Sequence, residues 1–210
     1  MIKLAVFDFD STLMDGETID MLAEDFGVGE EVRSITHRAM LGELDFFESL
    51  TKRVGFLRGM SEINAKKVCE NLPLMPGAKE CIAALKKNNI KVVCFSGGFS
   101  FATRYYARIL GLSADFSNIL HSKDGILTGK VGGDMMFRDS KGNMLARLQT
   151  LLNITPDETL AVGDGANDVS MFAYANKRVA FCAKPVLQKE ANIIINQKDL
   201  CKILMHLDIA

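Results

Sequence analysis

The sequence lacks a long hydrophobic run anywhere along its 210 residues. No stretch approaches the roughly 20 consecutive apolar residues that a membrane-spanning helix needs. The apolar run at the N-terminus is interrupted by Asp8 and Asp10, which leaves it too short for the apolar region of a secretory signal peptide. These absences predict a soluble protein of the cytoplasm.

Neither sign of charge is in excess, and the cysteines form no pairing pattern. Lys and Arg total 25 and Asp and Glu total 26, which gives a formal net charge of -1. A balanced charge does not favour nucleic acid or an anionic membrane as a partner. The five cysteines are an odd number without a C-x-x-C pair, which is typical of a reducing compartment. A chain of this length buries roughly 70% of its unfolded surface, so we expect it to fold without disulfides or a structural metal.

What the sequence does contain is a series of short apolar runs, each followed by turn-forming residues. They predict buried strands at residues 3–9, 91–95, 159–162, 179–182 and 193–195. Helical patterns occupy residues 77–87, 100–110 and 141–152. Because strands alternate with helices, we expect an α/β fold with a three-layer, Rossmann-like core, in which helices cover both faces of a parallel sheet.

Residues 15–74 break this alternation, because they contain no convincing strand and repeat their apolar residues at helical spacing. We predict a helical cap domain here, inserted after the first strand. Pro73 and Pro76 mark the return of the chain to the core. The catalytic core would then comprise residues 1–14 and 75–210.

A smaller insertion is predicted near residues 119–131. Asp124-Gly125 lies there between two apolar runs, which is typical of a β-hairpin. No internal repeat or low-complexity segment interrupts the chain. The expected architecture is therefore a parallel-sheet core with a helical cap and a small β-hairpin insertion.

Two acidic residues, Asp8 and Asp10, lie at the carboxyl end of the first predicted strand, in the segment D-F-D-S-T. In an open parallel sheet, ligands bind at the carboxyl ends of the strands, and a spacing of two lets both carboxylates reach one site. One carboxylate would attack phosphorus to form an aspartyl-phosphate. The other would protonate the departing alkoxide and then take a proton from water. Taken alone, the segment is also compatible with two residues that merely end a strand in a turn.

Ser96, Gly97 and Gly98 follow the second predicted strand. A hydroxyl beside flexible backbone can place an O–H and an N–H against phosphate oxygens, although a plain turn has a similar sequence. Cys94 occupies the first glycine position of a G-x-S-x-G motif, which argues against a serine hydrolase. Lys141, at the start of a predicted helix, would offset the negative charge of a phosphoryl group. A lone lysine is more often a solvated charge.

The sharpest signal is G-D-G-A-N-D at residues 163–168, directly after a predicted strand. Its glycines surround two carboxylates and an amide, and such oxygen ligands suit Mg²⁺. Without a cation, a carboxylate would approach a phosphate dianion against strong like-charge repulsion. We therefore predict a Mg²⁺-dependent reaction. The alternative is a surface turn followed by an Asp-capped helix.

The order of D-F-D-S-T, S-G-G, a lysine and G-D-G-A-N-D resembles the haloacid dehalogenase superfamily of phosphatases. The resemblance is closer still to the phosphoserine phosphatase family, and it extends over essentially the whole chain. It is carried by the segments D-G-E-T-I-D, K-R-V-G, S-G-G-F-S, A-V-G-D-G-A-N-D-V-S-M-F and A-F-C-A-K-P. It implies phosphoserine as a small-molecule substrate, a role in serine biosynthesis, and Mg²⁺ as cofactor.

The same resemblance implies roles for individual residues. Asp8 would be the nucleophile and Asp10 the general acid/base. Mg²⁺ would be held by the Asp8 side chain, the Asp10 backbone carbonyl and the Asp164 side chain, with Asp168 supporting this set. Phosphate would be held by Ser96, Gly97, Lys141 and Asn167. The oligomeric state stays open, with a homodimer as one alternative.

Selectivity for phosphoserine requires a cation for its carboxylate and an anion for its ammonium group. The family places these at the positions of Arg53 and Glu17, and arginine binds a carboxylate through two parallel hydrogen bonds. Each of the two would otherwise be a solvated charge on a cap helix. Met40 and Phe46 resemble the apolar wall of the family's pocket, although their helical spacing alone predicts ordinary cap core.

Other functions were weighed against this one. A related phosphomonoesterase or phosphotransferase, acting on phosphohomoserine or a sugar phosphate, would use the same loops, so the decision depends on Glu17 and Arg53. A non-catalytic phosphate-binding module would be expected to have lost a reactive residue, and all are present. A dinucleotide-binding oxidoreductase is excluded, because the first strand is followed by D-S-T and not by a glycine-rich loop.

Overall fold

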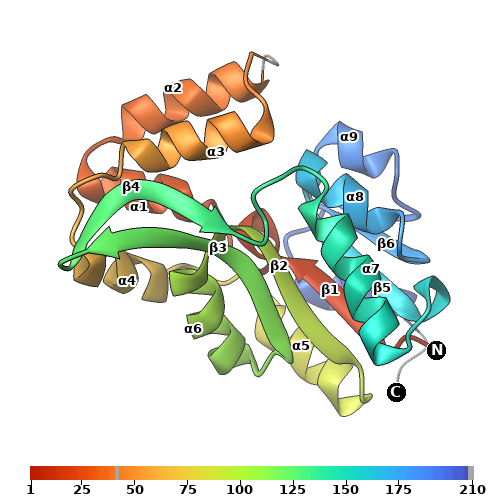
Figure 1. Cartoon of the computed structure of the whole chain (residues 1–210). Helices are drawn as coiled ribbons and strands as arrows, with labels where there is room; N and C mark the ends of the chain where they lie inside the picture. Colours follow the sequence, from red (N-terminus) through yellow and green to blue (C-terminus); the bar gives the residue numbers. More distant parts are fainter. Residues whose placement is uncertain (41–42, 208–210) are drawn as a thin grey trace.

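A computed structural model describes residues 1–40 and 43–207. The side chain of Met40 lies outside the described part, as do residues 41–42 and 208–210. The centre of the molecule is a sheet of seven strands in the order β4-β3-β2-β1-β5-β6-β7 (Figure 1). Neighbouring strands run parallel except for β3 and β4, which are antiparallel. The predicted α/β fold is thereby confirmed.

The three central strands are β2 (Lys91–Phe99), β1 (Leu4–Asp8) and β5 (Thr159–Gly163). All five residues of β1 are buried, as expected for a strand that helices cover on both faces. Asp8 pairs in register with Phe95 of β2, and Phe7 pairs with Val162 of β5. The chain segments that leave these three strands at their carboxyl ends therefore start at nearly the same level.

Side chains of β1 alternate between the two faces of the sheet. Ala5 and Phe7 join one apolar cluster, and Leu4 and Val6 join another on the opposite face. The first face is covered by α5 (Ala78–Lys87) and α6 (Ser100–Leu110), and the second by α7 (Ser140–Leu152), α8 (Val169–Phe172) and α9 (Pro185–Gln188). This burial on both faces fixes the position of the sheet edge that carries the acidic residues.

The outer strands are β3 (Ala114–Lys123), β4 (Ile126–Gly133), β6 (Lys177–Phe181) and β7 (Ile193–Ile195). Asp124 and Gly125 form the predicted hairpin turn, with positive φ angles of 53° and 77°. The hairpin is larger than predicted, because β3 already begins at Ala114. Its first residues pair in parallel with β2, so the hairpin is an extension of the main sheet.

Among the described residues, four α-helices lie between β1 and α5: α1 (Thr18–Phe26), α2 (Gly29–Met40), α3 (Phe46–Gly55) and α4 (Glu62–Glu70). The chain leaves the sheet and returns to it at adjacent points. The Asp15 N–H donates to the Pro73 carbonyl, and the Met75 N–H donates to the Leu13 carbonyl, both at 2.9 Å. This pairing supports a cap domain at residues 15–74, which we propose as a unit of the fold (Figure 1).

The remaining short helical segments are η1 (Phe9–Leu13), η2 (Pro156–Glu158), η3 (Ala166–Asp168) and η4 (Leu200–His206).

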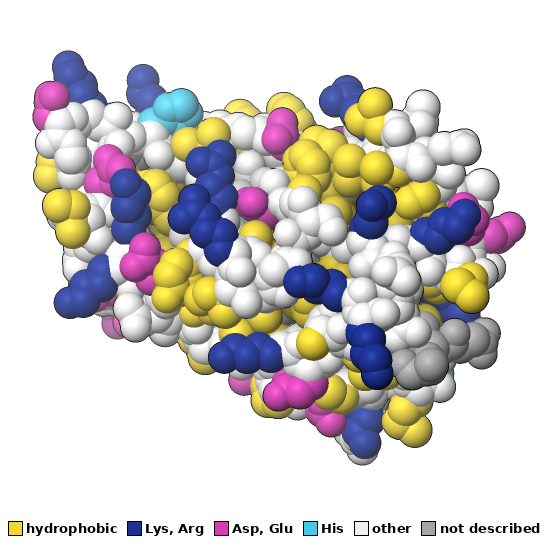
Figure 2. Space-filling model, turned by 90° about the horizontal axis from the view of Figure 1, so that it is seen from below, with side chains coloured by type: hydrophobic (Ala, Val, Ile, Leu, Met, Phe, Trp, Pro, Cys, Tyr) yellow, Lys and Arg dark blue, Asp and Glu magenta, His cyan; other side chains and the backbone are white. Residues whose placement is uncertain are grey.

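Within the described residues, no helix has both the length and the apolar composition that crossing a membrane requires. On the face shown in Figure 2, basic side chains are scattered among acidic, apolar and other side chains. This scattering agrees with the balanced charge of the sequence.

Candidate active site

A cavity of about 1000 Å³ opens at the carboxyl ends of the central strands, and helices α1 and α3 contribute to its wall. Its lining includes eight of the residues predicted from the sequence: Asp8, Asp10, Glu17, Phe46, Arg53, Gly97, Asp164 and Asn167. Ser96, Lys141 and Asp168 are buried behind this lining, where they hydrogen-bond with Gly98, Asp8 and Asp164, respectively. Met40 ends α2, and its predicted place in the pocket wall lies outside the described side chains. The fold thus gathers the predicted residues from distant parts of the sequence.

Asp8 is the last residue of β1, and its carboxylate is almost completely buried. Oδ1 accepts hydrogen bonds from the Phe9 N–H and from the Lys141 ammonium group, both at 2.7 Å. Oδ2 receives no hydrogen bond from the described residues, which leaves this oxygen available to attack. Burial raises the pKa of Asp8 well above its usual range, and the Asp168 carboxylate adds to this effect. A cation beside Asp8 would favour the ionised form that attack requires.

Lys141, in the first turn of α7, joins two of the carboxylates. Its ammonium group lies 2.7 Å from Asp8 Oδ1 and 2.6 Å from Asp168 Oδ1. Burial acts to lower the pKa of Lys141, but the carboxylates of Asp168 and Asp8 outweigh it and raise that pKa. The lysine is therefore charged at neutral pH, and it can offset charge on a phosphoryl group held at Asp8.

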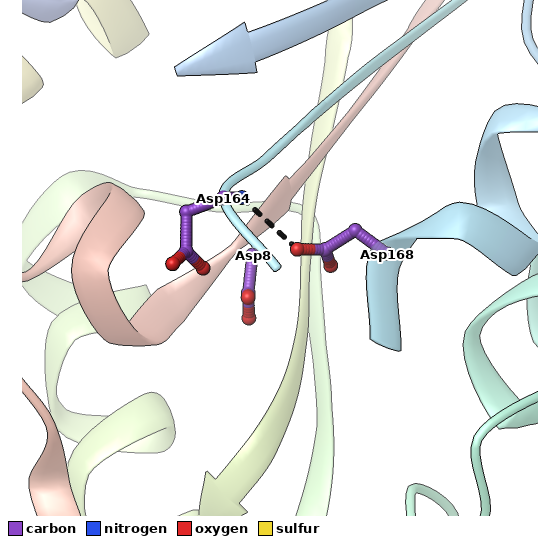
Figure 3. Close-up of side chains that lie close together, drawn as sticks. All are labelled: Asp8, Asp164 and Asp168. Carbon is purple, nitrogen blue, oxygen red and sulfur yellow. Dashed lines mark hydrogen bonds between the residues drawn. The ribbon is translucent and has the colours of Figure 1, made fainter. Parts of the chain in front are cut away.

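Asp8, Asp164 and Asp168 form an acidic cluster, with Asp8 between the other two (Figure 3). One oxygen of each lies within 4.8 Å of the others. Asp168 Oδ2 accepts hydrogen bonds from the backbone N–H groups of Asp164 and Gly165, each at 3.0 Å, and its Oδ1 accepts from Lys141. One oxygen of Asp168 thus holds the loop, and the other holds Lys141.

The charge of this cluster suits a divalent cation. Lys141 pairs with Asp8 and Asp168, and Lys184 acts on Asp164, yet burial, followed by the charge of Asp168, raises the pKa of Asp164 to about 6. Asp8 and Asp164 each retain an oxygen that no described residue hydrogen-bonds, so they can act as ligands. Carboxylate oxygens without histidine or cysteine are the donor set of a hard ion such as Mg²⁺.

Asp10 lies in the η1 turn, two residues beyond Asp8. Its Oδ1 accepts hydrogen bonds from the backbone N–H of Thr18, at 2.8 Å, and from the Thr18 hydroxyl. Burial, followed by the charge of Glu17, raises the pKa of Asp10 to about 7. Both protonation states are therefore populated near neutral pH, which is the requirement for a group that donates a proton and later accepts one.

The Ser96-Gly97-Gly98 segment continues β2 into the site. Ser96 Oγ accepts a hydrogen bond from the Gly98 N–H at 2.9 Å, so its O–H is free to donate to an anion. A Cβ atom at Gly98 would lie 2.5 Å from Asp10 Oδ2, which only glycine avoids. A Cβ atom at Gly97 would lie 3.1 Å from the Phe46 ring and 3.8 Å from Asn167 Nδ2, which shows how closely these residues surround it.

Glu17 and Arg53 bring opposite charges from the helical segment to the cavity. Glu17 accepts a hydrogen bond from the Ser11 hydroxyl at 2.8 Å, and burial raises its pKa. Arg53 is on α3, where its Nε donates to the Ser49 carbonyl at 3.3 Å. Burial lowers the pKa of Arg53, against the opposing charges of Glu17 and Asp20. The cavity thus offers one anion and one cation to a ligand.

Three residues of the site have no predicted role in the sequence analysis. Thr18 fixes Asp10 through its hydrogen bonds, while Asp20 and Lys184 line the cavity. Asp20 lies in the first turn of α1, where an acidic residue is ordinary, so its position gave no signal in the sequence. Lys184 follows the end of β6 closely, and the carboxyl end of a parallel strand was itself a signal.

Comparison with known proteins gives consistent results. Residues 2–176 match the family model described as haloacid dehalogenase-like hydrolase. The phosphoserine phosphatase of Wolinella succinogenes is 64% identical over 206 residues, which cover 98% of this chain and 100% of the relative. The phosphoserine phosphatase of Methanocaldococcus jannaschii is 44% identical, with 98% of this chain and 97% of the relative covered.

Solved structures are similar over almost the full length. A substrate-bound phosphoserine phosphatase complex is 43% identical with a TM-score of 0.94, and 99% of each chain is covered. A phospho-aspartyl intermediate analogue of phosphoserine phosphatase, also 43% identical, has a TM-score of 0.93 and covers 99% of each chain. The sheet, the inserted helices and the hairpin described above are therefore shared with these proteins.

Proposed function

This chain belongs to the haloacid dehalogenase-like hydrolases and, within them, to the phosphoserine phosphatases, and from that premise we propose that it hydrolyses O-phospho-L-serine to L-serine and phosphate. The reaction proceeds through an aspartyl-phosphate at Asp8. The observation that carries the proposal is the content of one cavity. Its wall combines the Asp8 and Asp10 carboxyl groups with a cation, Arg53, and an anion, Glu17. Phosphoserine carries a phosphate, a carboxylate and an ammonium group, which match these features.

In the first half of the reaction, an oxygen of Asp8 attacks phosphorus while the bond from phosphorus to the serine oxygen breaks. Protonated Asp10 donates its proton to that oxygen, so serine leaves as the neutral alcohol. The pKa of Asp10, raised to about 7, provides this protonated form at neutral pH. Thr18 engages only Oδ1 of Asp10, which leaves Oδ2 for the leaving group.

In the second half, the ionised Asp10 takes a proton from water while the water oxygen attacks phosphorus. The bond between phosphorus and Asp8 breaks, which releases phosphate and restores both carboxyl groups to their starting states. The Lys141 ammonium, the Ser96 hydroxyl, the Gly97 N–H and the Asn167 amide are the donors that we assign to the phosphoryl oxygens. Donors fixed before the reaction stabilise the charge that develops in the transition state.

We assign Mg²⁺ as the cofactor on the chemistry of the acidic cluster. The Asp8 and Asp164 carboxylates and the Asp10 backbone carbonyl would hold the ion, and Asp168 fixes the loop that presents Asp164. A bound Mg²⁺ would neutralise negative charge shared by the carboxylates and the phosphoryl group. The donors are all hard oxygen atoms, as this ion prefers.

We place the reaction in the reducing cytoplasm, where L-serine is a product of biosynthesis. The five cysteines are all unpaired thiols in the structure, and Cys69, Cys81 and Cys94 are buried. Buried unpaired thiols of this kind are typical of proteins that function without disulfides.

Phosphate release from a panel of phosphomonoesters tests the function. The panel contains phosphoserine, phosphohomoserine, a sugar phosphate and 4-nitrophenyl phosphate, each with Mg²⁺ and after chelation. We expect kcat/KM for phosphoserine to exceed that of the others by about tenfold or more. The sugar phosphate and 4-nitrophenyl phosphate lack both the carboxylate and the ammonium group, whereas phosphohomoserine has an extra methylene between these groups and the phosphate. Chelation should abolish release, and Mg²⁺ should restore it. A panel member with a higher kcat/KM would contradict phosphoserine as the substrate. Phosphate release that survives chelation would contradict the requirement for Mg²⁺.

Asp10→Asn tests the acid/base role. It should lower kcat for phosphoserine by about 10²- to 10⁴-fold, the usual contribution of a positioned general acid or base. Nitrophenolate needs no proton to leave, so 4-nitrophenyl phosphate should still phosphorylate Asp8. Stopped-flow absorbance should therefore show a burst of one nitrophenolate per enzyme, followed by slow turnover. Equal impairment of the burst and of the phosphoserine reaction would contradict the assignment.

A further inference from the structure

Asp20 lines the cavity, and no hydrogen bond or ion pair among the described residues includes its carboxylate. It lies in the first turn of α1, three residues beyond Glu17, which precedes the helix, and both residues line the cavity. Its Oδ1 atom is buried and has no hydrogen-bond partner among the described residues. A buried acceptor without a donor destabilises the fold, and its presence in a native protein calls for a reason.

Arg53, conversely, has hydrogen-bond donors that no described residue accepts. A guanidinium group carries five N–H donors, and the one hydrogen bond it makes to described residues is from Nε to the Ser49 carbonyl. No ion pair in the described part of the chain includes Arg53. Its two terminal nitrogen atoms are therefore available both to a ligand and to a neighbouring carboxylate.

The charges of the two side chains act on each other. Burial raises the pKa of Asp20, and Arg53 is the strongest influence that opposes this rise. Burial lowers the pKa of Arg53, and Glu17 and Asp20 are the two strongest influences against that change. Both side chains line the same cavity, and among the described residues no ion pair joins them in this conformation.

The other charged groups that act on Asp20 are less suited to donate a hydrogen bond to it. Arg33 also influences Asp20, but its guanidinium forms an ion pair with Glu24 on the exposed surface. Glu24 is itself acidic and offers no donor. Glu17 is held by the Ser11 hydroxyl and repels Asp20. Of the two cations that act on Asp20, Arg53 is consequently the one that lines the cavity.

We propose that Asp20 is a positioning residue for Arg53. When substrate binds, the Asp20 carboxylate accepts hydrogen bonds from one edge of the guanidinium group and turns its other edge toward the carboxylate of the substrate. Glu17 then accepts from the substrate's ammonium group. This inference rests on the proposed function, because it concerns how the same cavity selects an amino-acid phosphate.

The planar shape of the guanidinium group explains how one arginine can bind two carboxylates. A guanidinium can bind one carboxylate on each of two edges, and each pairing uses parallel N–H···O bonds. In the complex, a carboxylate on one edge fixes the direction in which the long side chain presents its other edge to the substrate. It also satisfies the buried Oδ1 atom of Asp20.

Three phosphate esters show which charged group of the substrate depends on Asp20 for its binding. Phosphoserine has both a carboxylate and an ammonium group, 3-phosphoglycerate has the carboxylate alone, and phosphoethanolamine has the ammonium group alone. Asp20→Asn should lower kcat/KM about 10- to 100-fold for the first two, mainly through KM, because one charge-assisted hydrogen bond is weakened. For phosphoethanolamine the change should stay within about twofold. Asp20→Glu, which retains the charge, should recover part of the loss.

The matched control is Asp25→Asn. Asp25 is on the same helix but exposed, and the variant keeps an acceptor for the Asn64 side chain. It should leave all three substrates unchanged. In an Arg53→Ala background, Asp20→Asn should add less than about a twofold further loss, since the residue it positions is gone.

Each other pattern overturns the inference. A loss on phosphoethanolamine but not on 3-phosphoglycerate would mean that Asp20 contacts the ammonium group. Equal losses on all three substrates would indicate a structural role, and no loss would indicate none. Additive effects of Asp20→Asn and Arg53→Ala would also reject it. If the wild type itself does not prefer phosphoserine to phosphoethanolamine, the proposed function fails; a preference that Asp20→Asn leaves intact rejects this inference alone.

Discussion

Replacement of Asp8 by Asn is expected to abolish phosphoserine hydrolysis, with kcat reduced on the order of 10⁴- to 10⁶-fold, the scale of losing a catalytic nucleophile. Asparagine has the shape of aspartate, and its amide oxygen can still accept from the Phe9 N–H and Lys141. It lacks the negative oxygen that attacks phosphorus. The loss should therefore appear in chemistry while the fold is retained, which steady-state phosphate release and thermal unfolding can separate.

Asp15→Asn provides the matched control for this variant. Asp15 follows the same β1–η1 segment, but its carboxylate pairs with Lys198 at the surface. Exposed ion pairs contribute little to stability, so this variant should retain wild-type activity and a nearly unchanged unfolding temperature. Turnover by Asp8→Asn above about 1% of the wild-type rate, far beyond the loss expected without a nucleophile, would show that another group attacks phosphorus.

Arg53→Ala is expected to change the selectivity of the enzyme. Removing one partner of a buried charge pair costs about 2–5 kcal/mol, so kcat/KM for phosphoserine should fall about 30-fold to a few thousand-fold. The aryl ester 4-nitrophenyl phosphate has no carboxylate, and its kcat/KM should stay within about threefold of the wild-type value. Steady-state kinetics on both substrates gives the comparison directly.

Arg58→Ala is the control for the loss of an arginine close to the same helix. Arg58 is exposed, and its Nε donates to the Thr128 carbonyl outside the cavity. The control should leave the ratio of the two kcat/KM values unchanged. If Arg53→Ala lowered both substrates equally, Arg53 would support the cap and not the recognition of a carboxylate, and the proposed basis for selectivity would be wrong.

Most of the core could be predicted because its strands are continuous apolar runs. The run ending at Asp8 is buried on both faces, and such a run has few alternatives to a central strand. The first half of β3 was missed, since Asp115, Ser117 and Asn118 interrupt its apolar pattern. Pairing with β2, and not local sequence, fixes that part of the chain as a strand.

The candidate site was predictable where its residues are contiguous in the sequence. Asp8 and Asp10, or Asp164 and Asp168, form compact motifs directly after strands. Asp20 gave no such signal, because an acidic residue in the first turn of a helix is ordinary in any protein.

The need for a glycine at Gly98 likewise could not be predicted from the sequence. Its lack of a side chain admits the Asp10 carboxyl group to the backbone of β2, and the two residues are far apart in the chain. Contacts of this kind depend on the sheet order that brings β1 beside β2, which was not fixed by any local pattern.

Acid quenching of the enzyme during turnover of phosphoserine with Mg²⁺, followed by mass spectrometry of its peptides, tests the central claim most directly. Low pH slows hydrolysis of an acyl phosphate, so the covalent intermediate can be recovered. We predict a phosphoryl adduct on Asp8, absent when substrate is omitted and absent in Asp8→Asn. An adduct on a different residue, or full turnover from phosphoserine without any adduct, would contradict the mechanism.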